Sequence, residues 1–126
     1  MQRFLIVCLG GAVGSGTRYL VGLWAGEKLG TSFPYGTLFV NLAGCLAIAF
    51  VLEMAVHVTS FPPNLRVGLT SGFMGGLTTY SSFNYETTSA FQRGDSKTAL
   101  AYLAVTLVGC ALAGLLGYTI ARRIWA

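Results

Sequence analysis

The sequence predicts an all-α integral membrane protein with four membrane-spanning helices, the third of which is broken. Of its 126 residues, 54% are hydrophobic and only 10% are charged, and the mean hydropathy is +0.66. Because a spanning helix needs about 20 apolar residues, the chain has room for four spans joined by short links. A Gly-Gly-Leu-Thr-Thr sequence inside the third apolar segment predicts the break. We expect residues 1–126 to form a single four-helix transmembrane domain.

The charge and cysteine patterns argue against several other classes of protein. The net charge is +4, but the basic residues are scattered at the ends of the spans, which argues against nucleic-acid binding. Cys8, Cys45 and Cys110 fall within apolar segments and lack the spacing of a metal site or a disulfide framework. No nucleophile–base pair supports an enzyme. We therefore expect a non-enzymatic protein embedded in the lipid bilayer.

The first span is expected from Phe4 to Ala25. Small residues recur along it every four positions and favour close approach of another helix; they are Gly10, Gly14, Gly22 and Gly26. Arg18 interrupts this stripe. It either extends its charge to the nearer membrane surface or draws anions into a vestibule. We favour the vestibule, because Arg18 lies on the packing stripe rather than on a lipid-facing side.

The second span is expected from Tyr35 to Val58. Four of its residues share one helix face; they are Thr37, Asn41, Gly44 and Ile48. Asn41 is the strongest polar residue inside this span, and taken alone it predicts an interhelical hydrogen bond. Glu53 and His57 lie one turn apart near the far end, and we assign them no chemistry.

The third span, expected over residues 64–91, contains the break at residues 71–83. Glycine costs roughly 1 kcal/mol in a helix interior relative to alanine, so the adjacent Gly75 and Gly76 favour departure from helical geometry. Backbone groups freed in hydrocarbon need partners, so a break predicts a polar environment at mid-membrane. Tyr80 and Phe83, three residues apart, share one face of the second half-helix.

The fourth span is expected from Thr98 to Ile120. One of its sides carries polar or sulfur-containing residues at every fourth position, namely Tyr102, Thr106 and Cys110. A second side is another close-packing stripe, formed by Gly109, Ala113 and Gly117. The segment that follows is a typical interfacial anchor, formed by Arg122, Arg123 and Trp125.

The basic residues are divided almost evenly between the two ends of the spans. One end holds Arg3, Arg66, Arg122 and Arg123, and the other holds Lys28, Arg93 and Lys97. Four against three, with Arg18 inside the membrane, gives no firm orientation by the positive-inside rule. We therefore expect the chain to insert both ways and to form an antiparallel homodimer.

Two kinds of ion site are predicted around the break. Carbonyl groups of the broken helix from two antiparallel copies would form a cage for a small hard cation such as Na⁺, in a structural role. Neutral donors nearby would replace the hydration of a small anion without trapping it. These donors are the ring edges of Tyr80 and Phe83, the amide of Asn41, and the hydroxyls of Thr37, Ser81, Tyr102 and Thr106. Glu86 lies beyond the aromatic pair, where we expect water to keep it ionised.

Segments 10–19, 36–44 and 72–83 resemble, in order and spacing, the signatures of the bacterial fluoride channels, the Fluc or CrcB family. The resemblance covers the whole chain. It implies a multi-pass protein of the bacterial plasma membrane that exports fluoride passively and confers fluoride resistance. It also implies a dual-topology antiparallel homodimer with two pores and a central structural Na⁺.

The resemblance also implies roles for individual residues. The pore aromatics fall on Tyr80 and Phe83, the pore asparagine on Asn41, and the Na⁺-binding carbonyls on Gly75 and Thr78. The line of polar pore side chains falls on Thr37, Tyr102 and Thr106, and on Cys110, where a hydroxyl would be more usual. Tyr80 is a departure, since the family normally has phenylalanine there, and its extra hydroxyl is expected to alter conduction.

Two other functions fit a short four-span protein. A dual-topology, proton-coupled exporter of toxic compounds needs a carboxylate embedded in the first span, where this chain has an arginine instead. A non-transporting assembly subunit would need only the glycine stripes, and it leaves the polar break unexplained.

Overall fold

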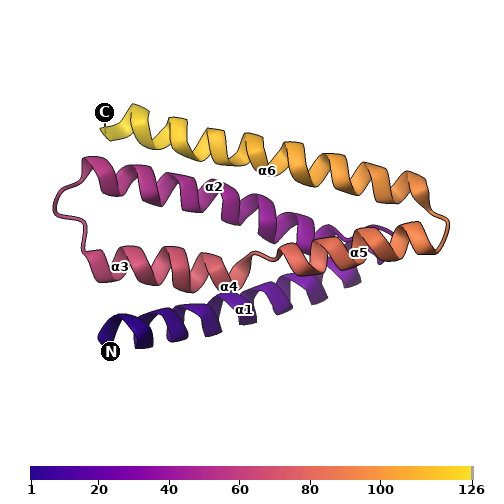
Figure 1. Cartoon of the computed structure of the whole chain (residues 1–126), viewed down its shortest axis with the longest axis horizontal. Helices are drawn as coiled ribbons and strands as arrows, with labels where there is room; N and C mark the ends of the chain where they lie inside the picture. Colours follow the sequence, from indigo (N-terminus) through magenta and orange to yellow (C-terminus); the bar gives the residue numbers. More distant parts are fainter. Residues whose placement is uncertain (126) are drawn as a thin grey trace.

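The computed structural model describes residues 1–125 as a set of helices with no strand in that range. Three of them, α1, α2 and α6, are long and apolar enough to cross a membrane. The remaining span, the third in chain order and called the third path below, is made of shorter segments that follow one another along the same direction (Figure 1). Both ends of the chain and the link after α2 lie at one end of the molecule (Figure 1). The predicted layout of four spans with a broken third is confirmed.

The long helices are α1 (Gln2–Leu29), α2 (Tyr35–His57) and α6 (Ser96–Trp125). The start of α2 agrees with the prediction and its end differs by one residue. The predicted limits of α1 and α6 were too narrow, because the helical hydrogen bonds continue through the polar residues that flank each apolar segment. At 30 residues, α6 is about 45 Å long, which exceeds a hydrocarbon core of about 30 Å.

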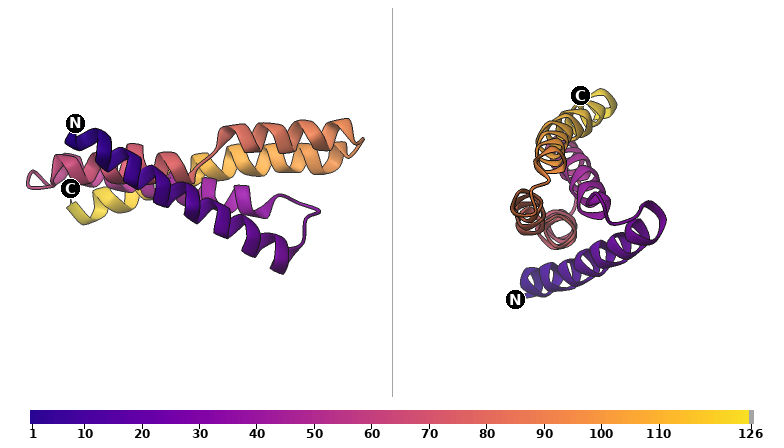
Figure 2. Two further views of the ribbon diagram at one scale, coloured as in Figure 1. Left: turned by 90° about the horizontal axis from the view of Figure 1, so that it is seen from below. Right: turned by 90° about the vertical axis from the view of Figure 1, so that its right-hand side faces the viewer.

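Helix α1 crosses the other helices obliquely (Figure 2), and it contacts the third path through its glycines. A side chain at Gly10 would lie 2.7 Å from the Gly68 carbonyl oxygen, and one at Gly14 would overlap the Phe73 carbonyl. A side chain at Gly36 of α2 would lie 2.8 Å from the Cα atom of Gly22. The predicted close-packing stripe is therefore confirmed, since the backbones approach where Cβ atoms are missing.

Helices α2 and α6 run side by side in the same direction (Figure 1) and form the most extensive contact between helices. Two glycines of α6 make this possible. A Cβ at Gly117 would overlap the Leu46 carbonyl oxygen, and one at Gly109 would lie 2.9 Å from Leu42 Cδ2. The stripe predicted on the fourth span thus packs against the second span.

The third path consists of α3 (Pro63–Val67), the π-helical segment η1 (Gly68–Met74), α4 (Gly75–Leu77) and α5 (Tyr80–Gln92). The predicted break exists and lies inside the predicted stretch 71–83, at its two threonines rather than at its glycine pair. Both glycines are helical, and the chain becomes extended at Thr78 and Thr79, with φ/ψ of −81°/156° and −153°/117°. Gly76 is needed for packing instead, because a side chain there would collide with the Gly11 carbonyl of α1.

The turn between α5 and α6 contains Gly94, whose φ of 79° favours glycine. Asp95 caps the start of α6 by accepting a hydrogen bond of 3.1 Å from the Thr98 amide. Hydrogen bonding by the Thr98 side chain and amide holds the pKa of Asp95 below its ordinary value. The cap therefore contributes stability at neutral pH and loses it as the pH falls through this lowered pKa.

Candidate functional site

Asn41 of α2 pairs with the peptide groups of the break. Its Nδ2 donates to the Thr79 carbonyl oxygen at 3.0 Å, and its Oδ1 accepts from the Thr79 amide at 2.8 Å. The Asn41 residue is only 7% exposed, so both bonds are shielded. The side chain thus replaces two helical hydrogen bonds that the extended residues cannot make. The interhelical bond predicted for Asn41 is confirmed, and its partner is backbone rather than a side chain.

Thr79 also starts the second half of the broken helix. Its Oγ1 accepts a hydrogen bond from the Ser82 amide at 3.2 Å, which caps α5. The hydroxyls of Ser81 and Ser82 each lie 3.2 Å from the same oxygen. Ser81, a predicted pore donor, is exposed on the single chain and is tied to this cap.

Two carbonyl groups at the break, those of Gly75 and Thr78, lack their usual helical donors. In a continuous helix, the Thr79 amide would bond to Gly75 O and the Ser82 amide to Thr78 O, but these amides donate to Asn41 Oδ1 and Thr79 Oγ1. Arg18 Nη1 donates to the Thr78 carbonyl at 3.2 Å instead. The half-buried Arg18 therefore lies at the break itself, and Gly75 is exposed on the outer surface of the chain.

Phe83 is the centre of an aromatic cluster beside the break. Its ring meets Tyr80 at 5.7 Å and 64°, and Tyr102 at 5.1 Å and 70°, both in edge-to-face geometry. Phe83 is 3% exposed and Tyr80 is 74% exposed. The two predicted pore aromatics thus touch, but only one is enclosed by its own chain. The Tyr80 hydroxyl makes no hydrogen bond within residues 1–125.

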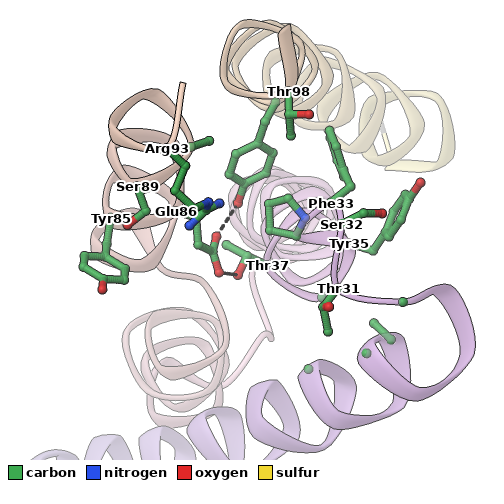
Figure 3. Close-up of a pocket in the computed structure, with 18 residues that line it drawn as sticks. Thr31, Ser32, Phe33, Tyr35, Thr37, Tyr85, Glu86, Ser89, Arg93 and Thr98 are labelled. Atoms are coloured by element: carbon green, nitrogen blue, oxygen red, sulfur yellow. Dashed lines mark hydrogen bonds between the residues drawn. The ribbon is translucent and has the colours of Figure 1, made fainter. Parts of the chain in front are cut away.

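Glu86 joins two of the predicted pore hydroxyls, a connection that the sequence did not reveal. Thr37 Oγ1 donates to Glu86 Oε1 at 2.8 Å, and the Tyr102 hydroxyl donates to Glu86 Oε2 at 2.7 Å (Figure 3). Each hydroxyl has a single proton, so neither can donate to another acceptor while it bonds to Glu86. One available signal was the position of Glu86, three residues after Phe83 on the same helix face.

These three residues line a cavity of about 340 Å³ at the end of the molecule opposite the termini. Figure 3 shows its walls, which come from the last turns of α1, from α5 and α6, and from the first turn of α2 with the link before it. Arg93 also lines the cavity, so its walls carry both a carboxylate and a guanidinium. The cavity leads inward to Tyr102, whose side chain is almost fully buried against Phe83.

Thr106 lies one turn beyond Tyr102 on the same side of α6. It is 4% exposed, and its hydroxyl oxygen has no hydrogen-bond partner within the described residues. Cys110 follows after one more turn and is half-buried. The structure thus joins Thr37, Phe83 and Tyr102 in one cluster, with Thr106 and Cys110 continuing along α6. Asn41 serves the break beside this cluster.

Comparison with known proteins gives a consistent result. Residues 5–118 match the model of a family described as CrcB-like protein, Camphor Resistance (CrcB). The chain is 50% identical over 113 residues to a protein of Anaeromyxobacter sp. (strain K) named fluoride-specific ion channel FluC, covering 90% of each chain. Relatives with the same name are 44% identical in Sorangium cellulosum, over 100% of this chain and 99% of that one, and 37% identical in Chloroflexus aurantiacus, over 97% of each.

The pairing of Asn41 with Thr79 predicts a large loss of stability on replacement by leucine. Asn41→Leu keeps the branched shape of the side chain but leaves one amide and one carbonyl unpaired, at about 1–3 kcal/mol each, or about 2–6 kcal/mol together. Equilibrium unfolding in detergent, followed by circular dichroism, measures the change. Thr17→Val is the matched control, because the Thr17 hydroxyl bonds only to Val13 O of its own helix. Equal stability of the two variants would contradict the role given to Asn41.

Proposed function

This chain belongs to the CrcB-like protein family, and from that membership we propose that it is a passive, fluoride-selective channel of a bacterial plasma membrane. The strongest support is the name of its relatives, fluoride-specific ion channel FluC, at identities up to 50% over nearly the whole chain. Relatives that are channels also fit a protein that is not an enzyme. The proton-coupled exporter is not favoured, since its essential carboxylate has no counterpart in the apolar part of α1, residues 4–25, where Arg18 lies instead.

The anion path that we propose begins in the cavity and runs between α5 and α6. Its first donors are the hydroxyls of Thr37 and Tyr102, its narrow part is bordered by the edge of the Phe83 ring, and Thr106 and Cys110 follow. The support from geometry is the buried and unpartnered Thr106 hydroxyl, whose proton is free for an anion. Tyr80, Ser81 and the second N–H of Asn41 supply donors on the side of the break, and Arg18 supplies positive charge there.

The carboxylate of Glu86 competes with an anion for the first two donors of this path. While Thr37 and Tyr102 donate to its carboxylate, their protons are unavailable to fluoride. An anion that enters the cavity must therefore compete with Glu86 for these two hydroxyls. Such competition weakens binding at the mouth, which suits a channel, because an ion must leave each site readily.

The working assembly that we propose is an antiparallel homodimer with a structural Na⁺ at its centre. Gly75 and Thr78 fit this ion, since both carbonyls lack their helical donors and Gly75 lies on the exposed surface. Hard oxygen ligands of this kind suit Na⁺, which would neutralise carbonyl dipoles at the break when bound. One lone pair of the Thr78 oxygen is used by Arg18, and the second remains for the cation.

Fluoride and chloride efflux from proteoliposomes tests the proposed function directly. A path of neutral donors between packed helices favours the smaller anion, so we expect rapid fluoride release and essentially no chloride release. Ion-selective electrodes measure both on vesicles from one preparation, with protein-free vesicles as the control. Equal release of the two ions would refute fluoride selectivity.

The two aromatic residues should affect flux in opposite directions. Phe83→Ile removes the ring edge, and loss of about 1.4 kcal/mol of stabilisation at the barrier slows passage about tenfold. Tyr80→Phe keeps the edge and removes a hydroxyl that can hold fluoride or bond across the path, so flux should rise. Initial efflux rates of both variants, compared with the parent at equal protein content, decide this. Parent-like flux in Phe83→Ile would reduce the aromatic pair to ordinary packing.

The proposed assembly predicts labelling from both membrane faces and a requirement for Na⁺. A single cysteine at Gln2, in a chain without its native cysteines, should react with an impermeant maleimide from either side of native membranes. Native mass spectrometry should find a dimer that dissociates when Na⁺ is replaced by a bulky organic cation. Labelling from one side only would exclude dual topology, and a dimer indifferent to Na⁺ would exclude the structural role of the ion.

A further inference from the structure

An apolar groove lies between α1 and the third path, in the half of the molecule where both begin (Figure 1). It has a volume of about 370 Å³, and its walls are the large side chains of Ile6, Leu9, Val13, Leu65, Leu69 and Phe73. Two glycines also line it. A Cβ at Gly10 would lie 2.7 Å from the Gly68 carbonyl oxygen, and one at Gly68 would lie 2.7 Å from Ile6 Cγ2. The backbones therefore meet at the glycines, and the larger side chains on either side leave a groove.

Asn64 is the one polar residue that lines the groove, and it positions a charge beside it. Its Oδ1 accepts a hydrogen bond of 3.2 Å from Arg3 Nε. Arg3 precedes the apolar part of α1, so its guanidinium lies at the level of the lipid headgroups. The four N–H groups on its two Nη atoms make no hydrogen bond within residues 1–125. Both salt bridges in that range involve Glu53, so Arg3 has no acidic partner there.

The groove faces away from the surface that the proposed dimer would bury. Ser71 and Gly75 are exposed, and they follow Leu69 and Phe73 by two residues, which is about half a helical turn. They therefore lie on the opposite side of the third path. Gly75 is a proposed ligand of the central ion, so its side would be the subunit interface and the groove would lie on the perimeter, in contact with lipid. This exclusion of a second copy rests on the proposed assembly.

We propose that the groove binds an anionic phospholipid, with an acyl chain along its apolar walls and the phosphate at the Arg3 guanidinium. From Ile6 to Val13, α1 rises about 10 Å, which fits within the roughly 15 Å that one leaflet contributes to the hydrocarbon core. A guanidinium binds a phosphate through two parallel hydrogen bonds. A zwitterionic lipid carries its own cation beside its phosphate, so it gains less from Arg3 than an anionic lipid does.

Lipid retention tests the headgroup part of the site. Delipidated protein in detergent is given phosphatidylglycerol or phosphatidylcholine, and the lipids that remain bound are counted by native mass spectrometry. We expect one firmly retained phosphatidylglycerol per chain. Arg3→Gln should lower its retention about fivefold, to the level of phosphatidylcholine, which is the contribution expected from one basic residue near the membrane surface.

Lys97→Gln is the matched control, because it removes the same charge from the opposite end of the spans. Its retention of phosphatidylglycerol should equal that of the parent. Equal retention of the two lipids by the parent, or an equal loss in the Arg3 and Lys97 variants, would overturn the proposal. Displacement of the lipid by inorganic phosphate would also overturn it, since the site would then recognise a free anion.

Filling the groove tests its apolar part. Val13 is 61% exposed, so Val13→Trp can occupy the groove without overpacking the chain, and it should abolish the firmly retained phosphatidylglycerol. Leu116→Trp, at a comparably exposed position of α6, should leave retention unchanged. Full retention in Val13→Trp would overturn the proposal.

Two further outcomes separate this site from the assembly and from the channel. Loss of the dimer in Val13→Trp, but not in Leu116→Trp, would assign the groove to a second copy of the chain and would overturn the lipid site. Absence of fluoride release from proteoliposomes would refute the proposed channel. Lipid retention needs no fluoride conduction, so it would still decide the site.

Discussion

The two hydrogen bonds between Asn41 and the Thr79 peptide groups are the constraint on which the rest of this structure depends. A helix cannot open in hydrocarbon unless its freed amide and carbonyl groups find partners. One side chain of α2 satisfies both groups of Thr79, and Gly44, one turn further along α2, makes room for the Thr78 side chain. The break and α2 are therefore fixed relative to each other.

This constraint extends to the remaining helices. Helix α6 packs on α2 through its glycines, which sets the position of Tyr102 against Phe83 and Glu86. Helix α1 packs on η1 and α4 through its own glycines, which brings Arg18 to the Thr78 carbonyl. The polar cluster thus follows from backbones that approach closely where Cβ atoms are absent, and not from attraction between charged side chains.

Hydropathy and glycine spacing were sufficient to predict the number of spans, the existence of the break and the faces that pack. The place of the break was not predictable from glycine content, because Gly76 serves close contact with Gly11, a purpose that the local sequence does not distinguish from flexibility. The role of Glu86 depends on the register of three helices, which no single segment encodes. Water at the mouth is the partner that the sequence predicts for its carboxylate, whereas the structure provides two hydroxyls from α2 and α6.

If the proposed anion path is correct, the positions of two nearby charges, Arg18 and Glu86, explain why neutral donors line it. At 4 Å, with an effective dielectric constant of 20, a unit charge attracts or repels an anion by about 4 kcal/mol, which corresponds to a change of nearly a thousandfold in rate. Neither Arg18 nor Glu86 forms an ion pair within residues 1–125; each instead bonds to neutral oxygen groups, a carbonyl for Arg18 and two hydroxyls for Glu86. In the anion path that we propose, these bonds would hold both charges at its flanks. On that proposal the neutral Phe83 ring edge and the Thr106 hydroxyl would bind an anion weakly enough to release it.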